Sequence, residues 1–263
     1  MRQIQGLTGV RWLAAFWVFI FHVNMGHRTP LTWLPWRLKN IVQQGPLGVT
    51  VFFVLSGFVL AYSHQRDFHH AIFRGKSYYF TFMLKRVARL YPVYLIGLLA
   101  AILVSIKLNS LPGLRVVAAN FLMITPYYPP IAMQWYSGGA WSICNEMFFY
   151  LAFPLVYPLS SRVRSVYVLL ALILLFSSVG FISGLSSFPN HDDALHYAFP
   201  PLRLAEFTAG VAGAILTFRR NWRVPSWAAV AFDGSYLFVI RWLGVAKHCY
   251  ARLAGSICYY RRA

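Results

Sequence analysis

Apolar residues fill long stretches of this chain, and polar residues gather in short segments between them. A helix needs about 20 predominantly apolar residues to cross a bilayer, and six stretches approach that length. A seventh stretch is interrupted by Asp233, and residues 116–124 are apolar but too short to cross alone. The pattern predicts an all-α, polytopic transmembrane helical bundle with spans at residues 7–25, 46–63, 90–106, 141–159, 166–185 and 197–218 and a less apolar seventh at 227–240.

The segments between these spans are too short to hold a soluble domain. The clear breaks are Pro112-Gly113, residues 125–130 and residues 189–193, so any chemistry must come from helices and short loops. The first span has the basic start of a secretory signal, but Arg11 lies within it and no small-residue cleavage site follows. We therefore expect this segment to be retained as a helix.

Composition agrees with the membrane class. The chain is 59% hydrophobic and 11% charged, whereas an ordinary soluble domain is roughly 25% charged. Its three cysteines form an odd set without metal-type spacing, so no disulfide framework is predicted, and Cys144 is expected to pack as a small apolar residue. The histidines and aspartates of residues 191–196 are explained by a solvated loop, and we expect no metal site.

A net charge of +18 raises the possibility of nucleic acid binding, but the distribution of charge argues against it. The basic residues lie at span ends, and most fall in the second, fourth and sixth loops counted from the N-terminus. This bias predicts a cytoplasmic N-terminus. Contact with anionic lipid headgroups explains most of these cations.

The first span carries two ionisable residues, Arg11 and His22, eleven positions apart. On an α-helix they lie about 20° apart around the axis and roughly 16 Å apart along it. Such groups cost about 2.5–3.5 kcal/mol each inside a span on insertion scales and usually face a cavity or a partner. Either both side chains reach opposite membrane interfaces, or desolvation keeps His22 neutral and able to accept a proton from an attacking hydroxyl.

Glu146 is one of only six acidic residues and lies among aromatic residues of a span. A buried carboxylate needs a cation, a proton or a function. No cation is near Glu146 in the sequence, so we expect a partner on another helix. Arg203 and Glu206 lie three residues apart in a later span, and their simplest interpretation is a mutual ion pair that locks packing.

Lys85, Arg86 and Arg89 precede the third span. Arg86 and Arg89 are three apart and would share a helix face, and guanidinium groups suit phosphates. Positive-inside anchoring explains them equally well. In the second span, Gly57 is expected to let helices approach closely, and Ser56 could line a polar cavity.

Five stretches in order resemble the membrane-bound acyltransferase type 3 family, over roughly residues 6–218. The first stretch has Arg11 and His22 at its two ends, with ten residues between them. The others are GPLGVTVFFVLSGF at 45–58, RVARLYP at 86–92, WSICNEMFFY at 141–150 and PLRLAEFTAG at 201–210. That family comprises bacterial O-acyltransferases that commonly acetylate sugars of surface glycans.

The resemblance implies a multi-pass enzyme of the bacterial inner membrane. It would move an acyl group, with acetyl as the expected one, from cytoplasmic acyl-CoA to a hydroxyl of a cell-surface or exported glycan such as lipopolysaccharide. Acyl-CoA is then a co-substrate rather than a permanently bound cofactor. Lipid, acyl-CoA and the glycan are the expected partners, and nucleic acid is not.

The resemblance also assigns roles to residues. His22 would be the general base or part of an acyl relay, with Arg11 on the same helix face. Glu146 would orient the histidine or organise the pocket. The candidates for binding the donor phosphates are Lys85, Arg86 and Arg89. The candidates for binding the substrate are Ser56, Trp141, Ser142, Arg203 and Glu206.

The chain departs from the family pattern near residue 237. Asp233-Gly-Ser-Tyr236 resembles the start of a later family stretch, but repeated Arg and Lys after residue 240 interrupt the apolar run expected there. We expect residues 1–240 to form an acyltransferase domain that is incomplete relative to the family. Residues 241–263 would be a basic, aberrant tail left by a truncation or a lost reading frame.

Two other interpretations stay open. An intramembrane set of His, Glu and Arg could relay protons in a proton-coupled transporter, although the chain shows neither internal repeats nor spans broken at matching positions. The chain could also be a truncated membrane protein without catalytic activity.

Overall fold

A computed structural model describes residues 5–25, 35–43, 45–71, 76–132, 134–165, 167–169, 171, 174–175 and 197–220. These residues form helices and turns and contain no strand, which confirms the all-α class. The helices are α1 (Gln5–Met25), α2 (Trp36–Gln43), α3 (Gly45–Ala71), α4 (Lys76–Lys107), α5 (Leu114–Phe121), α6 (Ser137–Arg162) and α9 (Pro200–Arg220), with 3-10 turns η1 (Thr125–Tyr127) and η2 (Pro129–Ile131).

Five of the six predicted spans coincide with helices α1, α3, α4, α6 and α9. By length and composition, two helical stretches are able to cross a membrane, Leu47–Gln65 and Tyr79–Lys107, and Gly9–Val23 is a shorter apolar helix. Most of the predicted span at 166–185 lies outside the described residues, as do the stretch 227–240, the tail 241–263 and the loop residues 191–196.

The third long helix begins earlier than predicted. The apolar pattern places its start at residue 90, but α4 begins at Lys76 and includes Arg86 and Arg89. Charged residues interrupt an apolar run without interrupting a helix, because arginine is a good helix former. Pro92 also lies inside α4, as is tolerated in membrane helices.

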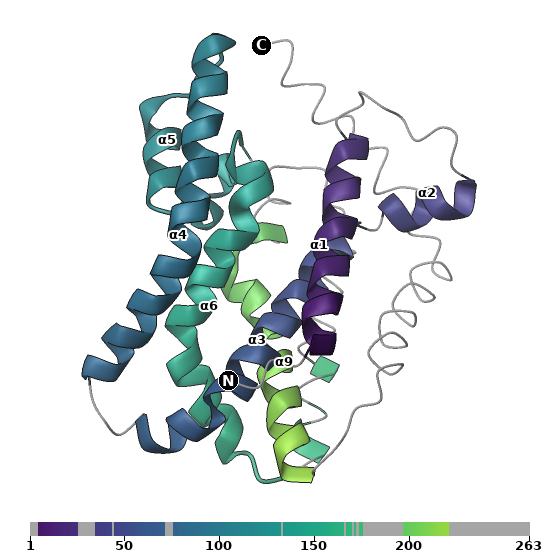
Figure 1. Cartoon of the computed structure of the whole chain (residues 1–263), viewed down its shortest axis with the longest axis vertical. Helices are drawn as coiled ribbons and strands as arrows, with labels where there is room; N and C mark the ends of the chain where they lie inside the picture. The colour runs from purple at the N-terminus through teal and green to yellow at the C-terminus, as the bar shows by residue number, and fades with distance from the viewer. Residues whose placement is uncertain are drawn as a thin grey trace.

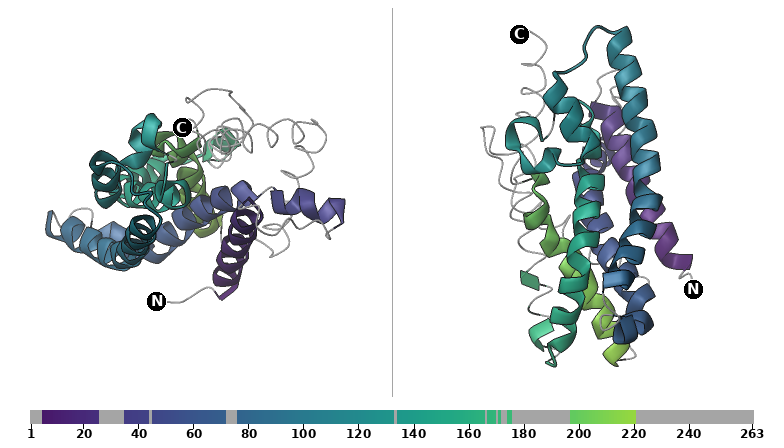
Figure 2. Two further views of the ribbon diagram at one scale, coloured as in Figure 1. Left: turned by 90° about the horizontal axis from the view of Figure 1, so that it is seen from above. Right: turned by 90° about the vertical axis from the view of Figure 1, so that its left-hand side faces the viewer.

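The long helices form a bundle in which α1 and α4 run in one direction and α3, α6 and α9 run in the other (Figure 1). Helix α1 packs on α3, α3 on α9, α9 on α6, and α6 on α4. Helix α2 projects from the side of the bundle near α1 (Figure 2), and α5 packs beside α4. Helix α3 therefore lies between the N-terminal helix and the rest of the bundle.

Two glycines bring the backbones of α3 and α9 together. A Cβ atom on Gly57 would overlap the backbone oxygen of Phe207, and one on Gly210 would overlap the backbone oxygen of Val54. Small residues at such crossings let membrane helices approach closely, because the backbones then gain van der Waals contact. The predicted packing role of Gly57 is confirmed.

Aromatic rings fill the space around this crossing. Phe53 of α3 meets Trp141 and Phe149 of α6 edge-to-face, with ring centroids 6.0 and 4.9 Å apart, and Phe149 stacks on Phe207 of α9 at 5.0 Å. Edge-to-face and offset pairs of this kind add about 0.5–1.5 kcal/mol each beyond their buried area. A second cluster joins α4 and α6 and contains Cys144, which packs as a small buried residue as predicted.

We predict that Gly57→Ala and Gly210→Ala destabilise the fold, because each new methyl group would meet backbone that cannot move aside. Overpacking of this kind costs about 1–3 kcal/mol. The matched control is Gly213→Ala, whose Cβ would lie 3.8 Å from the Phe58 ring, an ordinary contact. Thermal unfolding in detergent measures the effect, and equal midpoints for the three variants would contradict the close crossing.

Candidate functional site, an arginine-lined cavity

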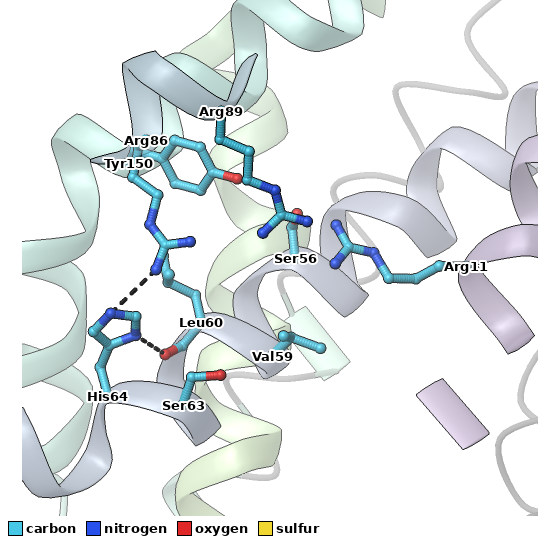
Figure 3. Close-up of a pocket in the computed structure, with 9 residues that line it drawn as sticks. All are labelled: Arg11, Ser56, Val59, Leu60, Ser63, His64, Arg86, Arg89 and Tyr150. Atoms are coloured by element: carbon cyan, nitrogen blue, oxygen red, sulfur yellow. Dashed lines mark hydrogen bonds between the residues drawn. The ribbon is translucent and has the colours of Figure 1, made fainter. Parts of the chain in front are cut away.

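A cavity of about 110 Å³ lies where α1, α3, α4 and α6 meet (Figure 3). Arg11 of α1, Arg86 and Arg89 of α4, and Tyr150 of α6 line it together with one face of α3. The two arginines of α4 share a helix face, as their spacing predicts. The structure adds Arg11 to them, so that three guanidinium groups from two helices reach one space.

One face of α3 supplies the rest of the lining. Positions three or four residues apart lie on the same side of a helix, and this spacing links Ser56, Val59, Leu60, Ser63 and His64. Gly57 follows Ser56 and is turned about 100° from it, toward α9. The close crossing with α9 therefore fixes the direction in which the polar face of α3 points.

Glu146 is the carboxylate behind this cavity. Its Oε1 atom accepts hydrogen bonds from the hydroxyls of Ser56 at 3.0 Å and Tyr150 at 2.5 Å. Arg11 Nη2 lies 3.9 Å from the same oxygen, and the Glu146 side chain is only 13% exposed. The predicted partner on another helix is confirmed, and all three contacts are with residues that line the cavity. The geometry thus favours pocket organisation over orientation of His22 as the role of Glu146.

Arg86 is held by aromatic side chains. Its Nη2 group donates to Nε2 of His64 at 3.1 Å. Its Cζ atom lies 5.2 Å from the ring centroid of Phe82, one turn earlier on α4, and 5.4 Å from that of Tyr150. Rings within about 6 Å attract a cation through their quadrupole. The imidazole and the two rings therefore orient the guanidinium group together.

The electrostatic result is a cavity with excess positive charge. As far as the described residues go, its lining has three guanidinium groups and no carboxylate, and Glu146 faces one of these cations at the long distance of 3.9 Å. Like charges repel strongly where the effective dielectric constant is low. An anionic group placed in the cavity would offset this repulsion, and a cleft of one sign raises the local concentration of such ligands.

His22 lies outside the cavity. Its side chain is exposed within the described residues, and Nδ1 lies 2.8 Å from the backbone oxygen of Val18. A carbonyl oxygen only accepts, so Nδ1 is the donor in this contact. Desolvation of the ring by lipid stays a prediction. The packed face of α1 passes through buried Ala14 and Phe21, which leaves the neighbouring His22 at its edge.

Arg203 and Glu206 form a buried ion pair with Nη1 2.7 Å from Oε1, which confirms the packing interpretation. Thr50 of α3 also donates to Glu206 at 3.2 Å, and Trp141 lies beneath the Arg203 guanidinium. These residues join α3, α6 and α9 rather than lining the cavity. Ser142 is half-buried and Lys85 is exposed, and neither lines it. Their proposed substrate and donor roles stay predictions.

Five lining residues were not anticipated from the sequence, and two of them, His64 and Tyr150, contact the predicted residues Arg86 and Glu146. His64 follows the apolar run of the second span, where a histidine is typical of a membrane interface. Helical spacing could have identified both residues. His64 is eight positions from Ser56 and Tyr150 is four positions from Glu146, so each shares a helix face with a residue that the sequence had singled out. Among the described residues, no three His, Cys, Asp or Glu side chains are grouped as metal ligands.

Comparison with known proteins gives consistent matches. A family model described as an acyltransferase domain matches residues 4–251. Acyltransferase MdmB of Streptomyces mycarofaciens is 31% identical over 242 residues, which are 85% of this chain and 60% of that protein. A protein of Staphylococcus aureus strain COL, provisionally named an O-acetyltransferase, is 27% identical over 59% of this chain and 25% of its own length.

A protein of Acidianus two-tailed virus, provisionally named an acetyltransferase, is 26% identical over 78% of this chain and 58% of its own length. The chain therefore spans 60% or less of the length of these three relatives. No solved structure matches the chain.

We predict that Glu146→Leu destabilises the protein by about 1.5–3 kcal/mol, the contribution of a hydrogen bond to a charged group. Tyr150→Phe removes one donor and should cost less. Because both substitutions break the same contact, the double variant should be no less stable than Glu146→Leu alone. Thermal unfolding of the four proteins in detergent measures this coupling.

The control for this double-mutant cycle is Tyr136→Phe. It removes a hydroxyl that donates to the backbone oxygen of Tyr94 at 2.9 Å, in the cluster that joins α4 and α6. Its effect should add to that of Glu146→Leu, because the two sites share no partner. Additive costs for Tyr150→Phe and Glu146→Leu would contradict the shared contact.

Proposed function

The chain belongs to the acyltransferase type 3 family, and from that premise we propose that it transfers an acyl group from acyl-CoA to a hydroxyl group of a cell-surface or exported glycan. Acetyl is the expected acyl group, in agreement with the names of two relatives. The protein would work as a multi-pass enzyme of the bacterial inner membrane.

The observation that carries this proposal is the convergence of Arg11, Arg86 and Arg89 on one cavity. Acyl-CoA carries several phosphate groups, and guanidinium groups bind phosphate oxygens through short, charge-assisted hydrogen bonds. A cavity of about 110 Å³ is much smaller than the roughly 300–1,000 Å³ of pockets that enclose a drug-sized ligand. It therefore fits one phosphate group of the donor rather than the whole molecule.

The position of the cavity agrees with a donor that arrives from the cytoplasm. Helices α1 and α4 run in the same direction (Figure 1), and Arg11, Arg86 and Arg89 lie in the half of the bundle in which both helices begin. The loop charges favour a cytoplasmic N-terminus. The phosphate site would then lie on the cytoplasmic side of the membrane.

His22 is the residue we assign to proton transfer. It lies eleven residues beyond Arg11, roughly 16 Å farther along the helix axis, so an elongated donor held by its phosphates at Arg86 would extend toward it. The acceptor oxygen attacks the thioester carbonyl carbon, and the bond from carbon to sulfur breaks. The hydroxyl proton passes to Nε2 of His22 and then to the departing thiolate of CoA.

We predict that Arg86→Ala and Arg89→Ala each raise the KM for acetyl-CoA roughly ten- to hundredfold. This range corresponds to the loss of a charge-assisted hydrogen bond of about 1.5–3 kcal/mol. The assay offers radiolabelled acetyl-CoA to membranes that contain the chain and measures label on glycan. The matched control is Arg115→Ala, an equal loss of charge at an exposed position on α5, which should leave KM unchanged.

Equal KM values for Arg115→Ala and Arg86→Ala would show a general charge effect and contradict a phosphate site in the cavity. Solute flux through these membranes without transfer of label would favour a transporter instead.

His22→Ala should abolish transfer of label even at saturating acetyl-CoA, because no other described group supplies the proton acceptor in this scheme. Phe21→Leu is the control, since it alters the neighbouring buried side chain without removing a base. Transfer that persists in His22→Ala would remove His22 from the mechanism.

A further inference from the structure

The three arginines of the cavity are held very differently. Arg86 has two rings over its guanidinium group and donates a hydrogen bond to His64. Arg11 lies beside Phe52 and faces Glu146 at 3.9 Å. Arg89 is exposed, and none of the described residues forms a hydrogen bond or ion pair with it (Figure 3). Arg86 is thus the cation whose position the surrounding structure specifies most fully.

The hydrogen bonds of His64 define its protonation state. An arginine only donates, so Nε2 of His64 must accept from Nη2 of Arg86, which lies 3.1 Å away. Nδ1 then carries the single ring proton and donates it to the backbone oxygen of Leu60 at 3.0 Å. The ring that contacts Arg86 is therefore neutral, with its lone pair directed at the guanidinium group (Figure 3).

Packing fixes the imidazole from its other sides. His64 is 7% exposed, and its ring meets Phe82 of α4 and Phe153 of α6 edge-to-face, with centroids 5.5 and 6.2 Å apart. Phe82 also lies under Arg86. One ring thus contacts both members of the pair, and the orientation of the imidazole and that of the guanidinium depend on each other.

We propose that His64 is a positioning residue that fixes the Arg86 guanidinium as a preorganised anchor for an anionic phosphate group. The inference rests on the proposed function only for the identity of that anion as part of acyl-CoA. Preorganisation lowers the cost of ordering a flexible arginine when the ligand binds. His64 acts through Arg86 on donor affinity and takes no part in the acyl-transfer step itself.

Two amide substitutions separate this role from simple filling of space. In His64→Gln the side-chain oxygen reaches the place of Nε2 and keeps an acceptor for Arg86. In His64→Asn the amide reaches only the place of Nδ1, so it can still bond to the Leu60 backbone but cannot reach Arg86. A purely structural role would change the thermal stability of the ligand-free protein but leave the KM for acetyl-CoA alike in the two folded variants.

The first measurement is donor kinetics in the labelled acetyl-CoA assay. His64→Asn should raise the KM for acetyl-CoA about two- to tenfold, as expected for one lost hydrogen bond of about 0.5–1.5 kcal/mol, with kcat at saturating donor unchanged. His64→Gln should restore KM toward that of the unaltered protein. Equal KM values for His64→Asn and the unaltered protein, or a loss of kcat alone, would overturn the inference.

The second measurement does not need acyl transfer. Thermal unfolding in detergent is followed with and without CoA, and with and without inorganic pyrophosphate, for the unaltered protein and both variants. Both anions should stabilise the unaltered protein and His64→Gln more than His64→Asn. If pyrophosphate does so while no label is transferred, the positioning role stands and the proposed acyltransferase activity fails. If neither anion stabilises the unaltered protein, Arg86 is no anion anchor and the inference fails.

Discussion

The structure depends on how a helical bundle accommodates positive charge. In the described part of the chain, three guanidinium groups reach one cavity, and the carboxylate of Glu146 lies behind them. That carboxylate joins α1 through Arg11, α3 through Ser56 and its own helix through Tyr150. Among the residues that the structure describes, one acid faces three cations, and this excess of positive charge makes an anionic ligand favourable.

Helix packing decides where this charge can act. The glycines of the α3–α9 crossing allow backbone contact, and this contact turns Ser56 and His64 of α3 toward α4 and α6. Aromatic rings of α4 and α6 then orient Arg86. The aromatic residues that pack the bundle therefore also hold the guanidinium group at the cavity where we propose that phosphate binds.

The sequence predicts the parts of this account that follow from helical periodicity and from the cost of charge in an apolar span. It places Arg86 and Arg89 on one face and requires a cation on another helix for Glu146. Periodicity cannot tell that the packed face of α1 passes through Phe21 rather than His22, which is exposed in the described residues. It also cannot reveal that Phe82 and Phe153 enclose His64, because that contact exists only after three helices pack.

The central claim, that the arginine cavity holds a phosphate group of acyl-CoA, is tested most directly by a structure of the protein determined with CoA bound. The account predicts phosphate density inside the cavity, within hydrogen-bond distance of Arg86, with the pantetheine arm directed toward His22. Phosphate density at another surface, with the cavity filled only by water or by the acceptor, would contradict it.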